Sequence, residues 1–270
     1  MSVGHYENFP VASVLLPARL RYPVTLIYRF AREADDFADE GVQEPALRLQ
    51  QLDEFRRQLR HIESGVTPEI AWFSELAVVI RKFNLPLSAF DDLLSAFSQD
   101  VVQPRYATFE DVMDYCRRSA NPVGRLMLTL YGCVGSKELA WSDAICSSLQ
   151  LINFLQDIEI DWRKNRIYLP QDEMQRFEVA EHEIARGQTG QRWAKFMAFQ
   201  VDRARALMRR GEPLGRTLKG RIGLEMRMII AGGNRILDKI ERVQGDVFRH
   251  RPVVRPVDWP LMLARALRGA

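Results

Sequence analysis

Apolar residues recur at three- and four-residue steps along most of this sequence, and this spacing constrains the fold more than any other feature. Such a period matches one face of an amphipathic α-helix, whereas the strict alternation of a half-buried β-strand is nearly absent. The sequence therefore predicts an all-α fold. Helices are expected over residues 23–39, 45–62, 67–83, 87–101, 108–131, 136–164, 191–210 and 223–243.

Capping residues suggest where some of these helices begin and end. Pro23 is expected in the first turn of the first helix, where a missing amide hydrogen does no harm, and Gly41 supplies a stop. Thr108 and Asp111 have the spacing of a capping box, in which the two side chains satisfy each other's backbone amides.

Size and composition favour a single domain over residues 1–270, since 47% of the residues are hydrophobic and can fill a substantial core. The 38 basic and 35 acidic residues alternate without a basic block, which argues against nucleic-acid binding. Cys116, Cys133 and Cys146 lack metal-ligand spacing and are interpreted as reduced thiols of a cytoplasmic protein. No leader pattern or bilayer-spanning apolar run is found, so neither secretion nor a transmembrane segment is expected.

The first informative motif is a group of carboxylates at the end of the first predicted helix. Asp35 and Asp39, with Asp36 beside them, continue the apolar stripe of this helix. Residues four apart lie on adjacent turns, with Cβ atoms about 6 Å from each other. One interpretation is a solvated acidic helix end. The other is a cation site, because like charges at this distance repel unless a cation lies between them.

A second motif favours the cation site. Gln150, Asn153, Asp157 and Asp161 step by three, four and four residues along one face of another predicted helix. We expect the two acidic faces to oppose each other across a cavity that is strongly negative when empty. A few hard oxygen ligands suit Mg²⁺, with Mn²⁺ as a substitute, and Mg²⁺ is usually shared with substrate phosphates. The histidines show no zinc-ligand spacing, and no Glu-x-x-His pair marks a di-iron site.

These motifs resemble those of the squalene/phytoene synthase family, and the resemblance extends over nearly the whole chain. The matching residues are Asp35, Asp36 and Asp39 in one motif, and Gln150, Asn153, Asp157 and Asp161, followed by residues 166–170, in the other. The resemblance implies a helical isoprenoid synthase bundle around a central cavity. It also implies that both aspartate motifs hold the metal.

The resemblance assigns roles to single residues. It implies that Arg32 contacts the diphosphate, that Tyr28 forms the pocket wall beside it, and that Tyr115 lies near the reacting carbons. The residues expected to bind substrate are Tyr28, Arg32, Gln150, Asn153 and Arg251, and those expected to act in catalysis are Tyr115, Asn121, Asp35 and Asp157.

Within the family, residues 5–13 and 115–124 resemble the branch that forms hydroxysqualene in bacterial hopanoid pathways. This implies conversion of presqualene diphosphate to hydroxysqualene with release of diphosphate and without a nicotinamide cofactor. Gln156 stands where a basic residue is common, and a pocket tyrosine of relatives is replaced near Gly233. Two alternatives stay open: head-to-head condensation of two prenyl diphosphates to presqualene diphosphate, squalene or phytoene, and a non-catalytic relative that acts as an assembly or membrane partner.

Pro122 interrupts the fifth predicted helix and leaves the carbonyl of Arg118 without its helical hydrogen bond, so a kink is expected. The kink has two interpretations. It is an ordinary packing feature, or it places the freed carbonyl and the Asn121 amide beside a carbocation, where they hold a water. The position of Tyr115 earlier in the same helix favours the second.

A C30 product is nearly insoluble in water, so we expect peripheral contact of the cytoplasmic protein with the inner membrane. Trp259, Leu263 and Leu267 share one face of a short amphipathic segment, with Arg265 and Arg268 nearby. An alternative is that this tail only packs on the domain. The sequence does not indicate an oligomeric state.

Overall fold

The computed structural model of the chain describes residues 15–41 and 43–268, and the all-α prediction is confirmed. Within these residues there is no β-strand, and one isolated β-bridge joins Arg105 to Ile167. Residues 5–13, which carry part of the family resemblance, lie outside the described residues. The helices are α1 (Ala18–Asp39), α2 (Pro45–Ser64), α3 (Ala71–Phe83), α4 (Leu87–Val102), α5 (Phe109–Ser119), α6 (Asn121–Tyr131), α7 (Ser136–Gln156), α8 (Ile158–Arg163), α9 (Gln171–Arg176), α10 (Glu181–Ala185), α11 (Gln191–Gly211), α12 (Pro213–Thr217), α13 (Gly220–Arg242) and α14 (Trp259–Arg268), with a 3₁₀ turn, η1 (Pro256–Asp258), before the last.

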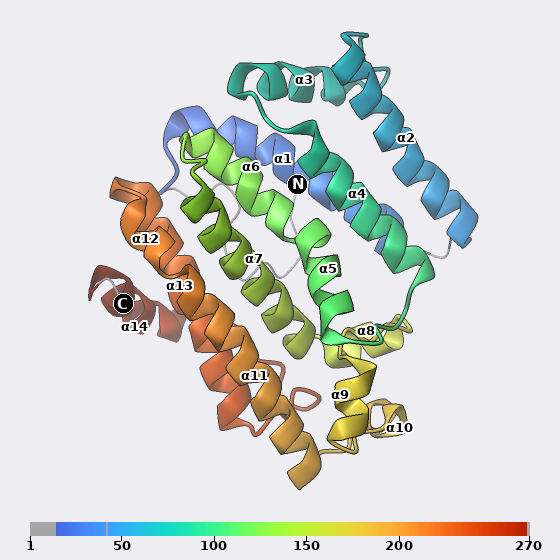
Figure 1. Cartoon of the computed structure of the whole chain (residues 1–270), viewed down its shortest axis with the longest axis vertical. Helices are drawn as coiled ribbons and strands as arrows, with labels where there is room; N and C mark the ends of the chain where they lie inside the picture. The colour runs from blue at the N-terminus through green and yellow to red at the C-terminus, as the bar shows by residue number, and fades with distance from the viewer. Residues whose placement is uncertain (1–14, 42, 269–270) are drawn as a thin grey trace.

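Helix α7 runs through the middle of the bundle (Figure 1). It packs against α6, α11 and α13, whereas α1 packs against α2, α3 and α4. Helices α5 and α6 contact both α4 and α7 and so join the two groups. The N-terminal and C-terminal parts of the chain therefore meet along α5 and α6.

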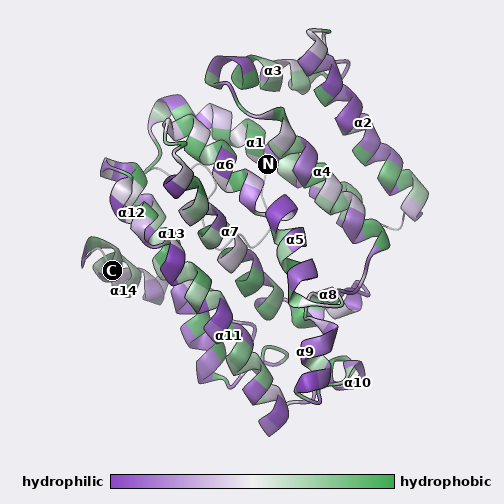
Figure 2. Ribbon diagram, viewed as in Figure 1, coloured by the Kyte–Doolittle hydropathy of each residue, from purple (hydrophilic) through white to green (hydrophobic). Residues whose placement is uncertain are grey.

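Two large apolar clusters form most of the core, one in each group, and a small third cluster lies between α13 and α14. The ring of Phe30 in α1 lies between 5.0 and 5.9 Å, centre to centre, from those of Phe55, Phe73 and Phe90. The other cluster is built largely on α7, α11 and α13. Figure 2 shows hydrophobic and hydrophilic residues sharing the same helices, as the amphipathic pattern predicted. Burying each large apolar side chain contributes roughly 1.5–3 kcal/mol to folding.

Local signals explain several helix ends. The Thr108 hydroxyl accepts from the Asp111 amide at 3.3 Å, and the Asp111 carboxylate accepts from the Thr108 amide at 2.9 Å, so the capping box is confirmed. Gly41 follows the end of α1 with φ at 76°, a left-handed conformation that suits glycine. The predicted stop is therefore confirmed as well.

Some predicted boundaries are wrong. Helix α1 begins at Ala18, so Pro23 lies inside it, and the carbonyl that it leaves free belongs to the exposed residue Arg19, where water can satisfy it. Helix α3 begins at Ala71 rather than at residue 67. The helix predicted over residues 136–164 is interrupted, because the backbone of Asp157 (φ −107°, ψ 14°) departs from helical geometry between α7 and α8.

The kink predicted at Pro122 is confirmed as a complete break. Helix α5 ends at Ser119 and α6 begins at Asn121, with Ala120 (φ −118°, ψ −48°) between them. None of the helices in the described part of the chain combines the length and hydropathy that crossing a bilayer requires.

Candidate active site

A cavity of about 800 Å³ opens between the two groups of helices. Small-molecule sites commonly measure about 300–1,000 Å³. Helices α1, α4, α5, α7, α8 and α13 all contribute to its wall. Among the residues that line it are nine of those predicted from the sequence: Arg32, Asp35, Asp39, Tyr115, Gln150, Asn153, Asp157, Asp161 and Arg251.

Helix α1 brings two aspartates to the cavity. Asp35 and Asp39 lie on successive turns and both line it. One turn earlier, Arg32 places Nη1 3.5 Å from Asp35 Oδ2 and Nη2 2.5 Å from Asp36 Oδ1. Asp36 is not among the lining residues, and neither is Tyr28, which is half-buried one turn before Arg32. The structure therefore brings two of the three α1 aspartates to the cavity.

The second motif lines another wall of the same cavity. Gln150 and Asn153 belong to α7, Asp157 lies at the helix break, and Asp161 belongs to α8. Backbone hydrogen bonds continue through the break, from the Asp157 amide to the Asn153 carbonyl at 2.9 Å and from the Asp161 amide to the Asp157 carbonyl at 2.8 Å. The break thus preserves the alignment that the spacing predicted.

Two basic residues that follow the second motif reach across to α1. Arg166 donates two hydrogen bonds to the Asp39 carboxylate, one of them at 2.8 Å, and Lys164 adds a third at 2.9 Å. The Arg166 guanidinium also lies 3.9 Å from Asp161. It therefore links the two acidic motifs.

The predicted strong negative charge of the empty cavity is wrong. Five carboxylates line the cavity, but so do four basic side chains, and with every group ionised the formal charge of the lining is −1. The acidic residues are Asp35, Asp39, Asp100, Asp157 and Asp161, and the basic ones are Arg32, Lys164, Arg166 and Arg251. The spacing identified carboxylates on two helices, but it did not indicate the basic side chains that fold onto them.

Burial affects these carboxylates unequally. Burial and the neighbouring Asp39 raise the pKa of Asp35 to about 7 against the opposing charge of Arg32. Burial, opposed by Arg166 and reinforced by nearby aspartates, raises the pKa of Asp161 to about 8. Burial would also raise the pKa of Asp39, but hydrogen bonds from Arg166 and Lys164 outweigh it and lower that pKa. Asp35 and Asp161 are therefore the carboxylates least compensated by the protein.

This donor set fits a magnesium ion shared with a ligand better than a closed protein site. In residues 15–41 and 43–268, no three Asp, Glu, His or Cys side chains lie close enough together to hold a metal by themselves. Mg²⁺ commonly takes one or two carboxylates and completes its coordination with water and phosphate oxygens. Asp35 and Asp161 offer hard oxygen atoms of this kind on the cavity wall.

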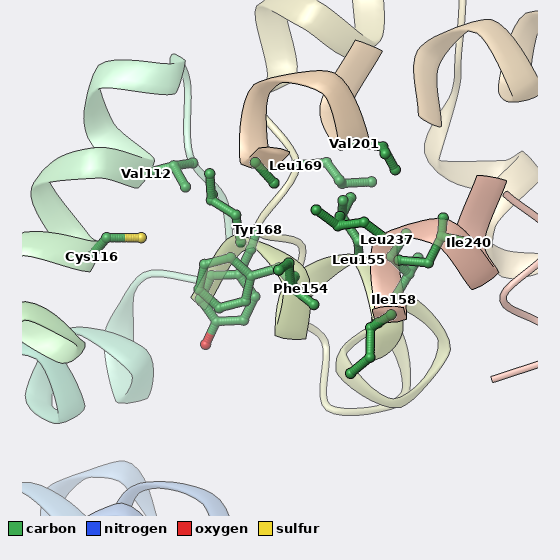
Figure 3. Close-up of a cluster of buried hydrophobic side chains, with 14 of the residues drawn as sticks. Val112, Cys116, Phe154, Leu155, Ile158, Tyr168, Leu169, Val201, Leu237 and Ile240 are labelled. Carbon is green, nitrogen blue, oxygen red and sulfur yellow. The ribbon is translucent and has the colours of Figure 1, made fainter. Parts of the chain in front are cut away.

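A cluster of aromatic side chains surrounds a further carboxylate, Asp100. The Tyr115 hydroxyl donates to Asp100 Oδ2 at 2.5 Å, and the Tyr168 hydroxyl donates to Oδ1 at 2.8 Å. The Tyr168 ring stacks on Phe154 with centroids 3.9 Å apart and planes at 4°, and Figure 3 shows the two rings overlapping. Burial raises the pKa of Asp100 to about 6, opposed by Arg166 and by the two hydroxyl groups.

Sequence reasoning missed Asp100, Lys164, Arg166 and Tyr168 as site residues. Asp100 lies in the last turn of α4, three residues after Phe97. A single aspartate at this spacing does not by itself indicate a functional site. Tyr168 lies inside the segment 166–170 that carried the resemblance, but no role was assigned to it. Only the folded chain brings Asp100 within hydrogen-bond distance of both tyrosines.

The structure does not bring Asn121 to the cavity. Its side chain is 6% exposed, and its Oδ1 accepts a hydrogen bond from Ser147 Oγ at 2.9 Å. Ser119 and Ala120 line the cavity instead. The Ser119 hydroxyl is inaccessible to solvent and has no hydrogen-bond partner.

The remaining wall is apolar. It includes Phe97, Val123, Cys146, Leu149, Ile152, Gly233 and Ile236. At Gly233 a Cβ atom would lie 2.7 Å from Met208 and 3.1 Å from Leu149, so α13 approaches its neighbours more closely than a larger residue would allow.

The three cysteines form no disulfide bond.

Gln156 helps to place Arg251 at the cavity. The Gln156 side chain donates to the Pro252 carbonyl at 2.6 Å, and Arg251 Nε donates to Asp157 Oδ1 at 2.6 Å. Two adjacent residues at the end of α7 therefore hold two adjacent residues of the C-terminal segment.

A family model described as squalene/phytoene synthase matches residues 3–258. Hydroxysqualene synthase of Rhodopseudomonas palustris is 34% identical over 257 residues, which cover 94% of this chain and 85% of that protein. The 15-cis-phytoene synthase of Synechococcus elongatus is 31% identical over 266 residues, covering 94% and 86%. The crystal structure of squalene synthase HpnC from Alicyclobacillus acidocaldarius superposes with a TM-score of 0.82 at 35% identity, covering 89% of this chain and 90% of that one.

Proposed function

Because this chain belongs to the squalene/phytoene synthase family, whose members act on prenyl diphosphates, we propose that it converts presqualene diphosphate to hydroxysqualene and releases diphosphate. The observation that carries the proposal is a single cavity in which two aspartate motifs adjoin an apolar wall. One part suits a metal-bound diphosphate and the other a long isoprenoid chain. The similarity to hydroxysqualene synthases supports this product over a condensation product.

The diphosphate would bind where acidic and basic side chains meet. Arg32, Lys164, Arg166 and Arg251 can each donate charge-assisted hydrogen bonds to phosphate oxygens. Magnesium bound to the aspartates would neutralise the leaving group as a Lewis acid. Substrate binding then exchanges contacts between basic side chains and aspartates for contacts between basic side chains and phosphate.

Departure of diphosphate breaks a carbon–oxygen bond and leaves a cyclopropylcarbinyl cation in the cavity. The rings of Tyr115, Phe154 and Tyr168 line the cavity, and the negative potential of aromatic faces would stabilise such a cation. Asp100, fixed by two tyrosine hydroxyls, adds negative charge beside them. The apolar wall keeps bulk water away while the cation rearranges. Water then adds, and no hydride donor is needed, so we expect no nicotinamide cofactor.

Product analysis tests this function. The protein is incubated with presqualene diphosphate, farnesyl diphosphate or geranylgeranyl diphosphate, with Mg²⁺ or with EDTA, and the lipids are identified by mass spectrometry. We expect hydroxysqualene from presqualene diphosphate only when Mg²⁺ is present. Formation of presqualene diphosphate, squalene or phytoene from the prenyl diphosphates would establish head-to-head condensation instead. Failure to consume any substrate would favour a non-catalytic relative.

We also propose that η1 and α14 rest on an anionic membrane surface. Five large apolar side chains there are between 41% and 78% exposed: Val257, Trp259, Leu261, Leu263 and Leu267. The other face of α14 packs on α13 through Met262 and Ala266, so the tail has both a packed side and a free side. Arg255 and Arg268 flank the free side and match anionic headgroups in charge.

Vesicle flotation tests the membrane proposal. The double variant Leu263→Gln, Leu267→Gln should bind vesicles containing anionic phospholipid less well than wild type. The matched control is Val78→Gln, which changes a residue of α3 that is 60% exposed. Equal flotation of the double variant and the control would exclude the α14 surface.

A further inference from the structure

Ser119 carries a hydroxyl group that folding leaves without a hydrogen bond. Its Oγ is inaccessible to solvent and has no partner, although Ser119 itself lines the cavity. Burying a hydroxyl without a hydrogen bond is unfavourable, and native proteins rarely leave such groups unpaired without a reason. The feature therefore points to a ligand that the hydroxyl meets in the working enzyme.

Two polar side chains close to Ser119 in the sequence already make hydrogen bonds. The Tyr115 hydroxyl donates to Asp100, and Asn121 accepts from Ser147. Of these three groups, the hydroxyl of Ser119 is the one for which the structure shows no hydrogen bond.

Helical phase places Ser119 beside the aromatic cluster. Tyr115, Ser119 and Val123 follow one another at four-residue steps, and all three line the cavity across the break at Ala120. A serine side chain has three staggered positions about its Cα–Cβ bond. A change of rotamer redirects the hydroxyl while the backbone stays in place.

We propose that Ser119 is a positioning residue that holds the water consumed in the reaction, an inference that rests on the proposed function. When the carbon–oxygen bond breaks, its electron pair leaves with the diphosphate. The oxygen of the held water donates a lone pair to the rearranged cation and forms the new carbon–oxygen bond. The proton that this water loses passes to the departing diphosphate, a base in the same cavity. Ser119 contributes one hydrogen bond and neither gains nor loses a proton.

The test measures how much hydroxysqualene forms for each diphosphate released from presqualene diphosphate in ¹⁸O-labelled water. For Ser119→Ala we expect diphosphate release to continue, while the hydroxysqualene fraction falls about fivefold, the factor that one neutral hydrogen bond supplies. Rearranged alcohols and hydrocarbons should replace it. Ser119→Thr keeps the hydroxyl and should retain hydroxysqualene as its main labelled product.

The control variant is Asn121→Ala. Asn121 lies two residues after Ser119, at the start of α6. Because it removes the acceptor of Ser147 Oγ, it should lower the melting temperature but leave the product ratio unchanged. Ser119→Ala should keep the melting temperature of wild type, since it removes an unpaired group.

An unchanged hydroxysqualene fraction in Ser119→Ala would overturn the assignment of the water to Ser119. Loss of diphosphate release in Ser119→Ala would overturn it too, because the residue would then act before water adds. If wild-type protein forms no labelled hydroxysqualene, the proposed function itself fails. The last outcome is read from wild type alone and is therefore distinct from the other two.

Discussion

The two aspartate pairs of the cavity share a four-residue spacing but reach different environments. Asp35 and Asp39 lie on one continuous helix, whereas Asp157 lies at the break between α7 and α8 and Asp161 lies within α8. In the first pair the later residue, Asp39, has basic partners within hydrogen-bond distance. In the second pair the earlier residue, Asp157, has one such basic partner, Arg251. The other member of each pair has a raised pKa.

This difference shows that local spacing sets the positions of the carboxylates, whereas distant segments of the chain set their electrostatic environment. Four-residue spacing sets the distance between two carboxylates of one helix. Which of the two is compensated depends on basic side chains that lie far away in sequence, such as Arg166 and Arg251. In both pairs, the carboxylate with the raised pKa is the one that we propose a bound cation compensates.

Removing one carboxylate from each pair should have the largest effect. Asp35→Asn and Asp157→Asn each delete a proposed metal ligand, so turnover should fall roughly a thousandfold, about 4 kcal/mol of transition-state stabilisation. The fold should survive, because both aspartates line the cavity and neither belongs to the apolar core. Steady-state rates and melting temperatures are compared with those of Asp53→Asn, an exposed aspartate of α2. Activity near wild type at low Mg²⁺ in either variant would remove that pair from the metal site.

Removing the link between the two motifs should have an intermediate effect. Arg166→Gln takes away the guanidinium that pairs with Asp39 and leaves only Lys164 against that carboxylate. We expect the metal-free protein to lose about 3 kcal/mol of unfolding free energy, measured by urea denaturation in EDTA. Arg117→Gln removes an exposed arginine paired with Asp114 and should change the same quantity by less than about 0.5 kcal/mol. Equal losses of unfolding free energy in both variants would mean that the ion pair of Arg166 with Asp39 contributes no more to stability than an exposed ion pair does.

Asp258 offers a comparison outside the cavity, with a smaller expected effect. It is 1% exposed and accepts from Arg235 at 2.8 Å and from Lys239 at 2.5 Å. Burial would raise its pKa, but hydrogen bonds from Lys239, the Arg255 amide and Arg235 outweigh burial and lower the pKa to about 2. Its permanent basic partners make it the counterpart of Asp39 rather than of Asp35.

A carboxyl group with a lower pKa in the folded state stabilises that state above its unfolded pKa and loses the effect as pH falls through the folded value. Asp258→Asn should therefore lower the unfolding free energy by at most about 2 kcal/mol at neutral pH and by much less near pH 2. Urea denaturation across this pH range measures the change. A loss that does not shrink with falling pH would show that its charge is not the cause.

The sequence predicted the helices and the aligned aspartates because both depend on residues a few positions apart. The contact of Arg166 with Asp39 spans 127 positions, so no local pattern could indicate it. Asp100 was missed for the same reason, since its tyrosine partners come from α5 and from the segment after α8. The cavity was predicted to be strongly negative because most of the basic side chains that pair with its aspartates lie far away in the sequence.

The position of Asn121 was a different kind of error. Residues four apart share a helix face, whereas residues six apart are separated by about 120° around the helix axis. Counted from Tyr115, helical phase therefore favours Ser119 over Asn121 as the residue facing the cavity. The proline beside Asn121 drew attention to the break, but the break itself does not turn Asn121 toward the cavity.

The near balance of acidic and basic side chains in the cavity affects how a substrate arrives. A lining of formal charge −1 casts a weak field into solution, so an approaching diphosphate is neither strongly repelled nor strongly attracted from a distance. At physiological ionic strength, charges separated by more than about 8 Å are largely screened in any case. Encounter rates should then depend little on salt, and recognition of the diphosphate begins only after it has entered.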